Sequence, residues 1–256
     1  LLLLLLSSLL PVHDDLEAAS EGQCPGAEAG GQRVISFSYY GPSSGRYLQG
    51  LKRNLAAASS HFPGWRLRLY VDSRSLESAS LALMEELATA WPVLQLCTGL
   101  GAARARNGML WRLLPFLDRR VEVVLVRDLD SLLSAREAAA VAAWLNSSLA
   151  VHVMRDHPSH SWPMMGGMWG ARLEGGSRGL LEGLVRRMLG QPLSWVWLYL
   201  ADQRQLQEVV WPRVQHLAMV HDSYHCRQLQ GGQGRPFPTQ REEGEDNWVG
   251  GQSVYL

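Results

Sequence analysis

The chain has 256 residues, with 24 Lys and Arg against 24 Asp and Glu, so its formal net charge is zero. Hydrophobic residues make up 46% and charged residues 19%, which is typical of a globular protein large enough for a substantial core. A balanced charge creates no field that would attract nucleic acid or an anionic membrane surface, and we therefore expect no nucleic-acid partner.

Residues 1–32 predict a leader followed by a linker. The run LLLLLLSSLLPV at residues 1–12 is too short to span a bilayer but fits the apolar part of a signal peptide or the end of a signal anchor. A disordered end is the alternative interpretation. The following residues are rich in Gly, Ala and Glu without periodicity. We expect one ordered domain over 33–256, in contact with a membrane only through such an N-terminal anchor.

Two further features favour the secretory pathway. Cys24, Cys97 and Cys226 allow one disulfide at most and leave one thiol over. Asn146-Ser147-Ser148 matches the acceptor pattern for N-glycosylation. Together with the apolar leader, these features predict a glycoprotein of the Golgi lumen or a secreted one.

From residue 33 onward, strand-like and helix-like segments alternate. Apolar and β-branched runs predict strands over 33–38, 66–72, 93–96, 121–126 and 150–155. Helical spacing of apolar residues predicts helices around 47–55 and over 75–91, 107–118, 134–145, 174–190 and 201–210. Ser134, followed by Glu137, forms a capping-box pattern at the start of one of them. This alternation predicts an α/β protein with a parallel sheet covered by helices on both faces.

The strand predicted over 121–126 ends in an acidic segment, Arg127-Asp128-Leu129-Asp130-Ser131. In an extended segment, residues two apart project to the same side, so Asp128 and Asp130 are expected to converge beyond the carboxyl end of the strand. Open α/β sheets bind ligands there. Two carboxylates suit a hard cation such as Mn²⁺ or Mg²⁺, which in turn binds a diphosphate. The simpler interpretation is that both residues cap the next helix or face solvent.

Several segments, taken in their order along the chain, resemble one known class of enzyme. They are FSYYG, WRLLPFLD, VRDLDS, MRDHPSHSWPMMGGMWG, ADQRQL, HDSYHC and NWVGG. Over roughly 33–250 they resemble nucleotide-sugar glycosyltransferases of the GT-A fold with an Asp-x-Asp motif, in a layout similar to the GT8-type enzymes. The resemblance implies a mostly parallel central sheet flanked by helices. It also implies metal-dependent transfer of a hexosyl or pentosyl group, with retention, from a UDP-sugar to the hydroxyl of a glycan or another acceptor.

The resemblance also implies a metal site. Asp128 and Asp130 would bind Mn²⁺ or Mg²⁺ together with the donor diphosphate, and His221 would complete the site. A small zinc site is a rival interpretation, since His221 and His225 are four residues apart and Cys226 follows them. A hydrogen-bonded core or surface histidine is the alternative for His221.

The same resemblance assigns residues to the donor nucleotide. Arg112 would bind the diphosphate, for which a bidentate guanidinium is well suited. Tyr39 or Tyr40 would contact the uracil and ribose, although only one of them is expected to do so. Gly167, within GGMWG at 166–170, would allow close approach of the backbone to the donor. Ordinary packing, a solvated helix face and a tight turn are the alternatives.

Three residues are predicted to act at the reacting sugar. Asp202 and Gln203 match an Asp-Gln pair that faces the donor sugar in similar enzymes, although an Asp near a helix N-terminus is common for electrostatic reasons. Asp156, in RDHPSHSW, would lie on the acceptor side, or would be the base if the reaction inverts the anomeric centre. A polar loop joined by internal hydrogen bonds is the simpler interpretation of that segment.

Two other functions fit parts of the sequence. A secreted carbohydrate-binding protein would keep the fold without turnover. A metal-dependent nucleotidyl or phosphoryl transferase would also need an acidic pair. Such an enzyme is expected to carry a glycine-rich phosphate loop with a lysine, and the one lysine of this chain, Lys52, lies in a predicted helix.

Overall fold

The structure is a computed structural model that describes residues 24, 30–41, 45–100, 107–191, 200–226, 234–241 and 247–251. Most of the predicted leader and linker, 1–32, lies outside the described residues. Within them the strands are β1 (Gln32–Tyr39), β2 (Arg66–Val71), β3 (Leu94–Cys97), β4 (Val121–Arg127), β5 (Val151–Arg155), β6 (Met168–Arg172), β7 (Ala218–Asp222) and β8 (Gly234–Arg235). The helices are α2 (Gly45–His61), α3 (Ser78–Ala90), η2 (Gly108–Leu117), α4 (Ala135–Leu145), α5 (Gly175–Leu189), α6 (Ala201–Gln205), η4 (Leu206–Val210), α7 (Trp211–Val214) and η5 (Gln215–Leu217).

The strands form one mixed sheet in the order β3-β2-β1-β4-β6-β5-β7-β8. Strand β6 pairs antiparallel with both β4 and β5, whereas the other neighbouring pairs are parallel. The fold is therefore α/β, as the alternation of segments predicts, but the sheet is not purely parallel. Because β4 and β5 both run opposite to β6, they run in the same direction as each other.

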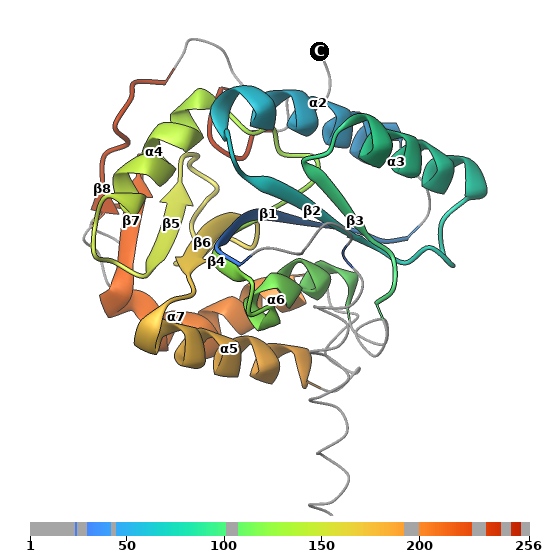
Figure 1. Cartoon of the computed structure of the whole chain (residues 1–256). Helices are drawn as coiled ribbons and strands as arrows, with labels where there is room; N and C mark the ends of the chain where they lie inside the picture. The colour runs from blue at the N-terminus through green and yellow to red at the C-terminus, as the bar shows by residue number, and fades with distance from the viewer. Residues whose placement is uncertain are drawn as a thin grey trace, which may run out of the picture.

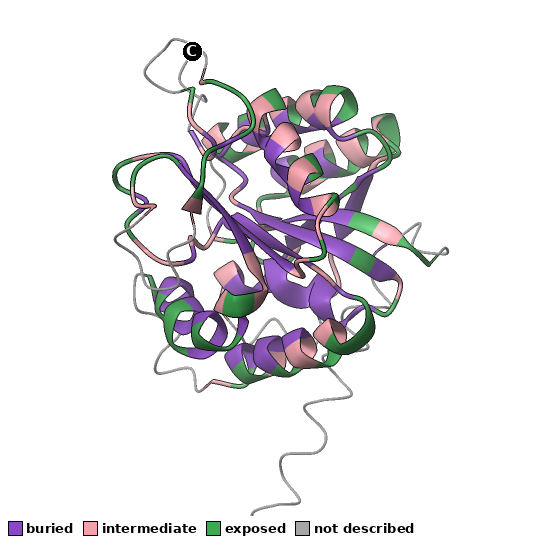
Figure 2. Cartoon of the chain, turned by 90° about the vertical axis from the view of Figure 1, so that its left-hand side faces the viewer, coloured by how far each residue is buried: buried purple, intermediate pink, exposed green. Residues whose placement is uncertain are grey.

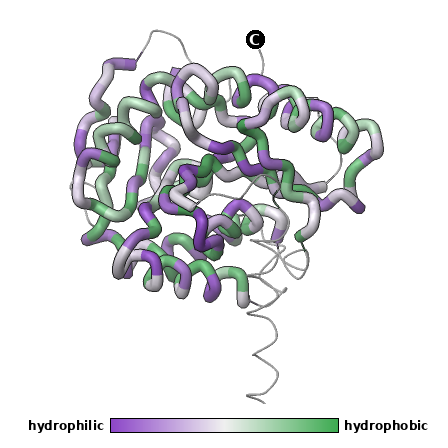
Figure 3. Tube along the Cα trace, viewed as in Figure 1, coloured by the Kyte–Doolittle hydropathy of each residue, from purple (hydrophilic) through white to green (hydrophobic). Residues whose placement is uncertain are grey.

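Helices cover both faces of the sheet. Helices α2, α3 and α4 lie on one face, and α5, α6 and α7 lie on the other (Figure 1). The strands between these layers are almost entirely buried, and exposed residues gather on the outer sides of the helices (Figure 2). Hydrophobic and hydrophilic residues accordingly alternate along the helical segments of the chain (Figure 3).

Successive residues of the central strands enter two separate cores. In β1, Ile35 and Phe37 pack with the α2, α3 and α4 layer, while Val34 packs with the opposite layer. In β4, Leu125 joins the first core, and Val126 joins the second. This alternation follows from the two-residue period of a strand, and it explains why β1 and β4 carry apolar residues on both faces.

Several elements differ from their sequence-based predictions. The segment 107–118 forms a 3₁₀ helix with Pro115 inside it, because a proline lacks the N–H that an α-helix needs there. The segment 201–210 divides into α6 and the π-helical η4. Ser134 caps α4 by accepting a hydrogen bond from the Glu137 N–H, whereas the Glu137 side chain pairs with Arg127.

A disulfide joins Cys24 to Cys97 at the end of β3. It connects a residue of the N-terminal segment to the edge strand of the sheet, and Cys24 is itself buried in the second core. Cys226 has a free thiol. Among the described residues, no helix is both long and apolar enough to cross a bilayer.

Candidate active site at the carboxyl edge of the sheet

One edge of the sheet collects most of the polar segments singled out by the sequence. Strands β1, β4, β5 and β7 all end at this edge, and β6 begins there, as their pairing directions require. The segments that emerge at this edge are 38–40, 128–131, 156–160, 164–167 and 223–226. Chain segments distant in sequence therefore meet at the place where α/β sheets commonly bind ligands.

The acidic segment after β4 forms a turn. The N–H of Ser131 donates to the carbonyl of Asp128 at 3.1 Å, so residues 128–131 are not extended as predicted. Strand pairing stops at Arg127, where β4 meets the start of β6, and the chain is then free to turn. Asp128 and Asp130 nevertheless line the same pocket; their side chains are 47% and 11% exposed.

Helix α2 holds this acidic turn in place. The buried side chain of Asn54 donates to the carbonyls of Leu129 and Ser131 at 3.1 and 3.0 Å, and its oxygen accepts from the N–H of Leu133 at 2.9 Å. A Cβ on Gly50 would come within 2.3 Å of the Leu129 carbonyl, so only glycine permits this contact. Neither residue was predicted to position the site, because each reads as an ordinary helical residue.

The pocket has a volume of about 130 Å³. Its walls come from the end of β1, the start of α2, η2 and the acidic turn. The lining residues are Ser38, Tyr39, Tyr40, Tyr47, Met109, Arg112, Asp128, Leu129 and Asp130. Five residues singled out from the sequence thus line one small cavity, which contains both aromatic rings and charged groups.

The two predicted tyrosines occupy different environments. Tyr39 is buried in the core beneath the pocket, with its ring edge against Tyr47 at 5.8 Å between centroids. Tyr40 is exposed and packs edge-on against Trp111 at 6.1 Å. Partial burial and nearby Asp202 raise the pKa of Tyr40 to about 12, although Arg112 opposes the shift, so its hydroxyl stays protonated at neutral pH. Of the two rings, Tyr40 is the one accessible to a ligand.

Arg112 connects the acidic turn to α6. Its guanidinium donates to Asp128 and, at 2.8 Å, to Asp202, which lies 90 residues away in the chain. Burial disfavours the charge on Arg112, but the carboxylates of Asp128 and Asp202 outweigh it and raise the pKa of Arg112 above its ordinary value. The guanidinium is therefore permanently charged and fixed between two carboxylates.

The segment just before β6 lies against these groups. Gln203 accepts a hydrogen bond from the N–H of Gly166 at 2.8 Å and donates to the carbonyl of Met164. A Cβ on Gly166 would lie 2.9 Å from both Arg112 Nη2 and Asp202 Oδ2, and one on Gly167 would lie 2.1 Å from Asp128 Oδ2. The close approach predicted for Gly167 is thus made to the carboxylate cluster, and Gly166 has the same role.

Arg46 is a member of this site that the sequence did not reveal. It lies in the first turn of α2 and forms an ion pair with Asp130. Burial and the neighbouring Asp128 raise the pKa of Asp130, whereas Arg46 lowers it. An arginine at the start of a helix has no distinguishing pattern in sequence, because it resembles any solvated basic residue.

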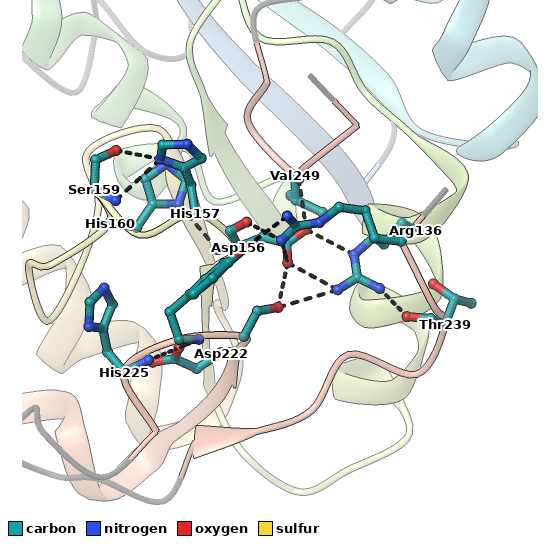
Figure 4. Close-up of polar contacts among 12 residues, drawn as sticks. Arg136, Asp156, His157, Ser159, His160, Asp222, His225, Thr239 and Val249 are labelled. Carbon is teal, nitrogen blue, oxygen red and sulfur yellow. Dashed lines mark hydrogen bonds and ion pairs between the residues drawn. The ribbon is translucent and has the colours of Figure 1, made fainter. Parts of the chain in front are cut away.

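Asp156 lies at the same edge but in a separate cluster (Figure 4). Its carboxylate accepts hydrogen bonds from Arg136 at 2.8 and 3.0 Å, from Arg241 at 2.8 Å and from the Val249 N–H at 3.0 Å, and also from Ser223. Burial opposes ionisation, but Arg136 and the other donors lower its pKa to about 2. A carboxylate so fully engaged is a poor proton acceptor, and its position indicates a structural role.

His221 is separated from the acidic turn by two intervening strands of the sheet. It lies on β7, whereas the acidic turn follows β4, and β6 and β5 intervene. Three strand spacings amount to about 14 Å. Its Nδ1 lies 2.8 Å from Nε2 of the fully buried His152, and its ring packs against Phe237. The structure does not bring His221 to Asp128 and Asp130.

The zinc interpretation receives no support from the described residues. They contain no group of three or more His, Cys, Asp or Glu side chains able to hold a metal ion. His221 lies in a strand, so helical spacing does not bring His225 to the same side. Nε2 of His225 lies 2.8 Å from the carbonyl of Pro158, and the Cys226 thiol donates to the carbonyl of Asp222.

The buried histidine pair predicts a dependence of stability on pH. Burial lowers the pKa of His221 to about 4, with Arg235 and Arg136 contributing, and burial also lowers the pKa of His152. An unfolded histidine binds its proton near pH 6.5, so the unfolded state gains protons first as pH falls. We expect stability to decline from about pH 6.5 to about pH 4, by up to about 1.4 kcal/mol per pH unit for each proton.

Urea unfolding over this pH range measures the effect, with His221→Gln as the comparison. Glutamine keeps an amide that can hydrogen-bond His152 but removes one titrating group. The decline in the variant should be clearly shallower than in the wild type. An identical slope in both proteins would show that other groups cause the pH dependence.

Comparisons with known proteins find only distant similarity of architecture. No protein-family model and no curated protein matches the chain. A glycosyltransferase involved in the glycosylation of the major capsid of PBCV-1 aligns at 17% identity and TM-score 0.41, over 75% of this chain and 81% of its own. The mannosyltransferase PcManGT from Pyrobaculum calidifontis, in complex with GDP-Man and Mn²⁺, aligns at 13% identity and TM-score 0.47, over 83% and 66%.

The bifunctional glycosyltransferase WbbM aligns at 13% identity and TM-score 0.46, over 78% of this chain and 39% of its own. The chain therefore spans less than two thirds of the length of PcManGT and of WbbM. All three neighbours are glycosyltransferases by description. At these identities and scores, the likeness does not extend to donor, metal or mechanism.

Proposed function

We propose that this chain is a glycosyltransferase that moves a sugar from a nucleoside diphosphate donor to the hydroxyl of an acceptor. The observation that carries the proposal is the cluster in which Arg112 joins Asp128 of the acidic turn to Asp202 of α6. The family resemblance assigns the first carboxylate to the diphosphate end of a donor and the second to its sugar end. A nucleotide sugar carries its diphosphate and its sugar next to each other, so it needs two such carboxylates close together in one site.

Asp128 and Asp130 are the residues that would hold Mn²⁺ or Mg²⁺. Two carboxylates on one small pocket are oxygen ligands of the kind these cations prefer, and Asp128 is half-exposed and accessible. Such cations commonly take their remaining ligands from water and from substrate phosphates. When bound, the cation supplies positive charge that stabilises the departing diphosphate.

The remaining residues of the pocket bind and orient the donor. Arg112, fixed between Asp128 and Asp202, presents a charged guanidinium to the diphosphate. Tyr40, exposed beside Trp111, offers an aromatic ring to the nucleotide base. Asp202 and Gln203 face the donor sugar in this proposal, and the carboxylate stabilises positive charge that develops at the anomeric carbon as the diphosphate leaves.

The finer specificity follows the family resemblance. We assign a UDP-sugar as donor, a glycan or another hydroxyl compound as acceptor, and retention of the anomeric configuration. Two features support a site of action in the secretory pathway. The Cys24–Cys97 disulfide is of a kind that persists in oxidising compartments. Asn146 of the N-glycosylation pattern is exposed at the end of α4, where a transferase can reach it.

Donor hydrolysis tests this proposal without knowledge of the acceptor. The purified protein is incubated with Mn²⁺ and a panel of UDP-sugars and GDP-sugars, and released nucleotide is measured. We expect hydrolysis of at least one UDP-sugar, lost on removal of the metal by chelation and in the Asp128→Asn/Asp130→Asn variant. Absence of both hydrolysis and calorimetric binding for every donor would contradict the proposal.

A further inference from the structure

The acidic turn is neutralised by the protein itself. Asp128 forms an ion pair with Arg112, and Asp130 forms one with Arg46. The two arginines come from different elements, η2 and α2, and approach the turn separately. A divalent cation at this turn therefore has to compete with arginine for the carboxylates that would bind it.

The two arginines are held with different firmness. Arg112 is 7% exposed and is fixed by a second carboxylate, Asp202, at 2.8 Å. Arg46 is 30% exposed and lies at the start of α2. An ion pair with a partly exposed long side chain is weak, because water competes for the guanidinium and the pair restricts its rotamers. Arg46 is therefore the arginine that a ligand can displace.

We infer that Arg46 is a positioning residue that couples cation binding to diphosphate binding at the acidic turn. This inference rests on the proposed function. A divalent cation and Arg46 compete for Asp130, so the cation alone has to break an existing ion pair. In the ion pair the guanidinium already lies 5.9 Å from the ring centroid of Tyr47, which lines the pocket, so a displaced guanidinium stays beside the pocket. There it meets the diphosphate, whose oxygens match the fork of an arginine.

A coupling of this kind acts in both directions. If a nucleoside diphosphate raises the affinity for the cation by some factor, the cation raises the affinity for the nucleotide by the same factor. Without the nucleotide, Arg46 remains the counter-ion of Asp130 and the cation binds weakly. With the nucleotide bound, the arginine has a second anion to contact, and the carboxylate is released to the cation.

Calorimetric titration with Mn²⁺, with and without saturating UDP, tests the inference. The variant is Arg46→Gln, and Lys52→Gln is the control, since it removes the same charge from an exposed position on the same helix. We expect Arg46→Gln to bind Mn²⁺ alone about tenfold more tightly than the wild type, and UDP in the presence of Mn²⁺ about tenfold more weakly. Lys52→Gln should match the wild type in both measurements.

Three other results would overturn the inference in distinguishable ways. If Arg46→Gln binds Mn²⁺ alone no more tightly than the wild type, Arg46 does not compete for Asp130, and the proposed function is unaffected. If the affinity of Lys52→Gln for Mn²⁺ rises as much as that of Arg46→Gln, the cause is the change in net charge rather than the loss of the ion pair. If no form binds Mn²⁺ even with UDP, the metal-dependent function fails together with the inference.

Discussion

Asp156→Asn is expected to destabilise the protein by about 3–5 kcal/mol, the cost typical of removing one partner from a buried charge cluster. The Asp156 side chain is fully buried and forms ion pairs with both Arg136 and Arg241. An asparagine has the same size, but it carries no charge and offers one acceptor oxygen instead of two. Both arginines would then lose their shared counter-ion, and the Val249 N–H or an arginine would lose its acceptor.

The pH dependence of the wild type provides a second readout for this residue. The folded-state pKa of Asp156 is about 2, below the value near 3.9 of an unfolded aspartate. The carboxylate therefore contributes stability above about pH 3.9, and the contribution is lost as pH falls toward 2. Asp156→Asn should lack this acid-dependent loss, which separates Asp156 from the histidine pair, whose effect lies between pH 6.5 and 4.

Urea unfolding and assays normalised to folded protein complete the test. An exposed control on α3, Glu86→Gln, removes the same charge and should change stability by no more than about 0.5 kcal/mol. Activity per folded molecule of Asp156→Asn should fall only modestly, because the contact of Asp156 with the acidic turn is indirect. Asp156 accepts a hydrogen bond from the Val249 N–H, and the carbonyl of the neighbouring Gly250 accepts one from Ser131 of the turn. A stable but inactive variant would instead restore Asp156 as a catalytic base.

The strands whose own sequence is rich in apolar residues could be predicted, whereas the strands whose conformation depends on pairing with neighbouring strands could not. Strands β1, β2, β4 and β5 are rich in apolar and β-branched residues, which pack against the covered faces of the sheet, and this pattern is visible in sequence. Strands β6 and β7, MWGAR and AMVHD, are short and contain Gly, Arg, His or Asp. Their strand conformation comes from pairing with β4 and β5, which is a property of the tertiary fold.

The residues of the candidate site also differ in how far the sequence could predict their positions. Asp128, Arg112, Asp202 and Gln203 lie within one cluster, because Asp128 follows the end of β4, Asp202 and Gln203 lie at the start of α6, and Arg112 of η2 joins the two carboxylates. His221 also belongs to one of the motifs on which the family resemblance depends, but it lies on β7, three strand positions from β4 and the acidic turn. Position across the sheet depends on strand order, which no local pattern encodes.

Other members of the site had no sequence signal. Asn54 and Arg46 act through contacts with the acidic turn, more than 70 residues away in the chain. A buried asparagine in a helix and an arginine at its start are common in any protein. The acidic segment itself was expected to be extended, and its turn conformation depends on the hydrogen bonds that Asn54 supplies.

Asp202→Asn is expected to lower turnover by about 10²–10³-fold, the loss typical when a group that stabilises developing charge is removed. The substitution keeps the size of the side chain, and its amide oxygen can still accept from Arg112, whose bond to Asp202 measures 2.8 Å. Stability should fall, because Asp202 and Arg112 form a buried ion pair, but by less than in Asp156→Asn, since Arg112 keeps Asp128 as a counter-ion. Affinity for UDP should also stay close to that of the wild type, since UDP has no sugar for Asp202 to contact.

Glu208→Gln is the matched control, because Glu208 is exposed on η4, directly after α6, and its removal changes the net charge equally. Turnover numbers, UDP binding by calorimetry and thermal unfolding are compared for the two variants and the wild type. NMR of the product's anomeric proton then identifies the stereochemical outcome, and retention is expected if Asp202 and Gln203 face the donor sugar. An inverted product from a fully active Asp202→Asn variant would remove this pair from the reaction, because neither its charge nor its position would then matter to the anomeric carbon.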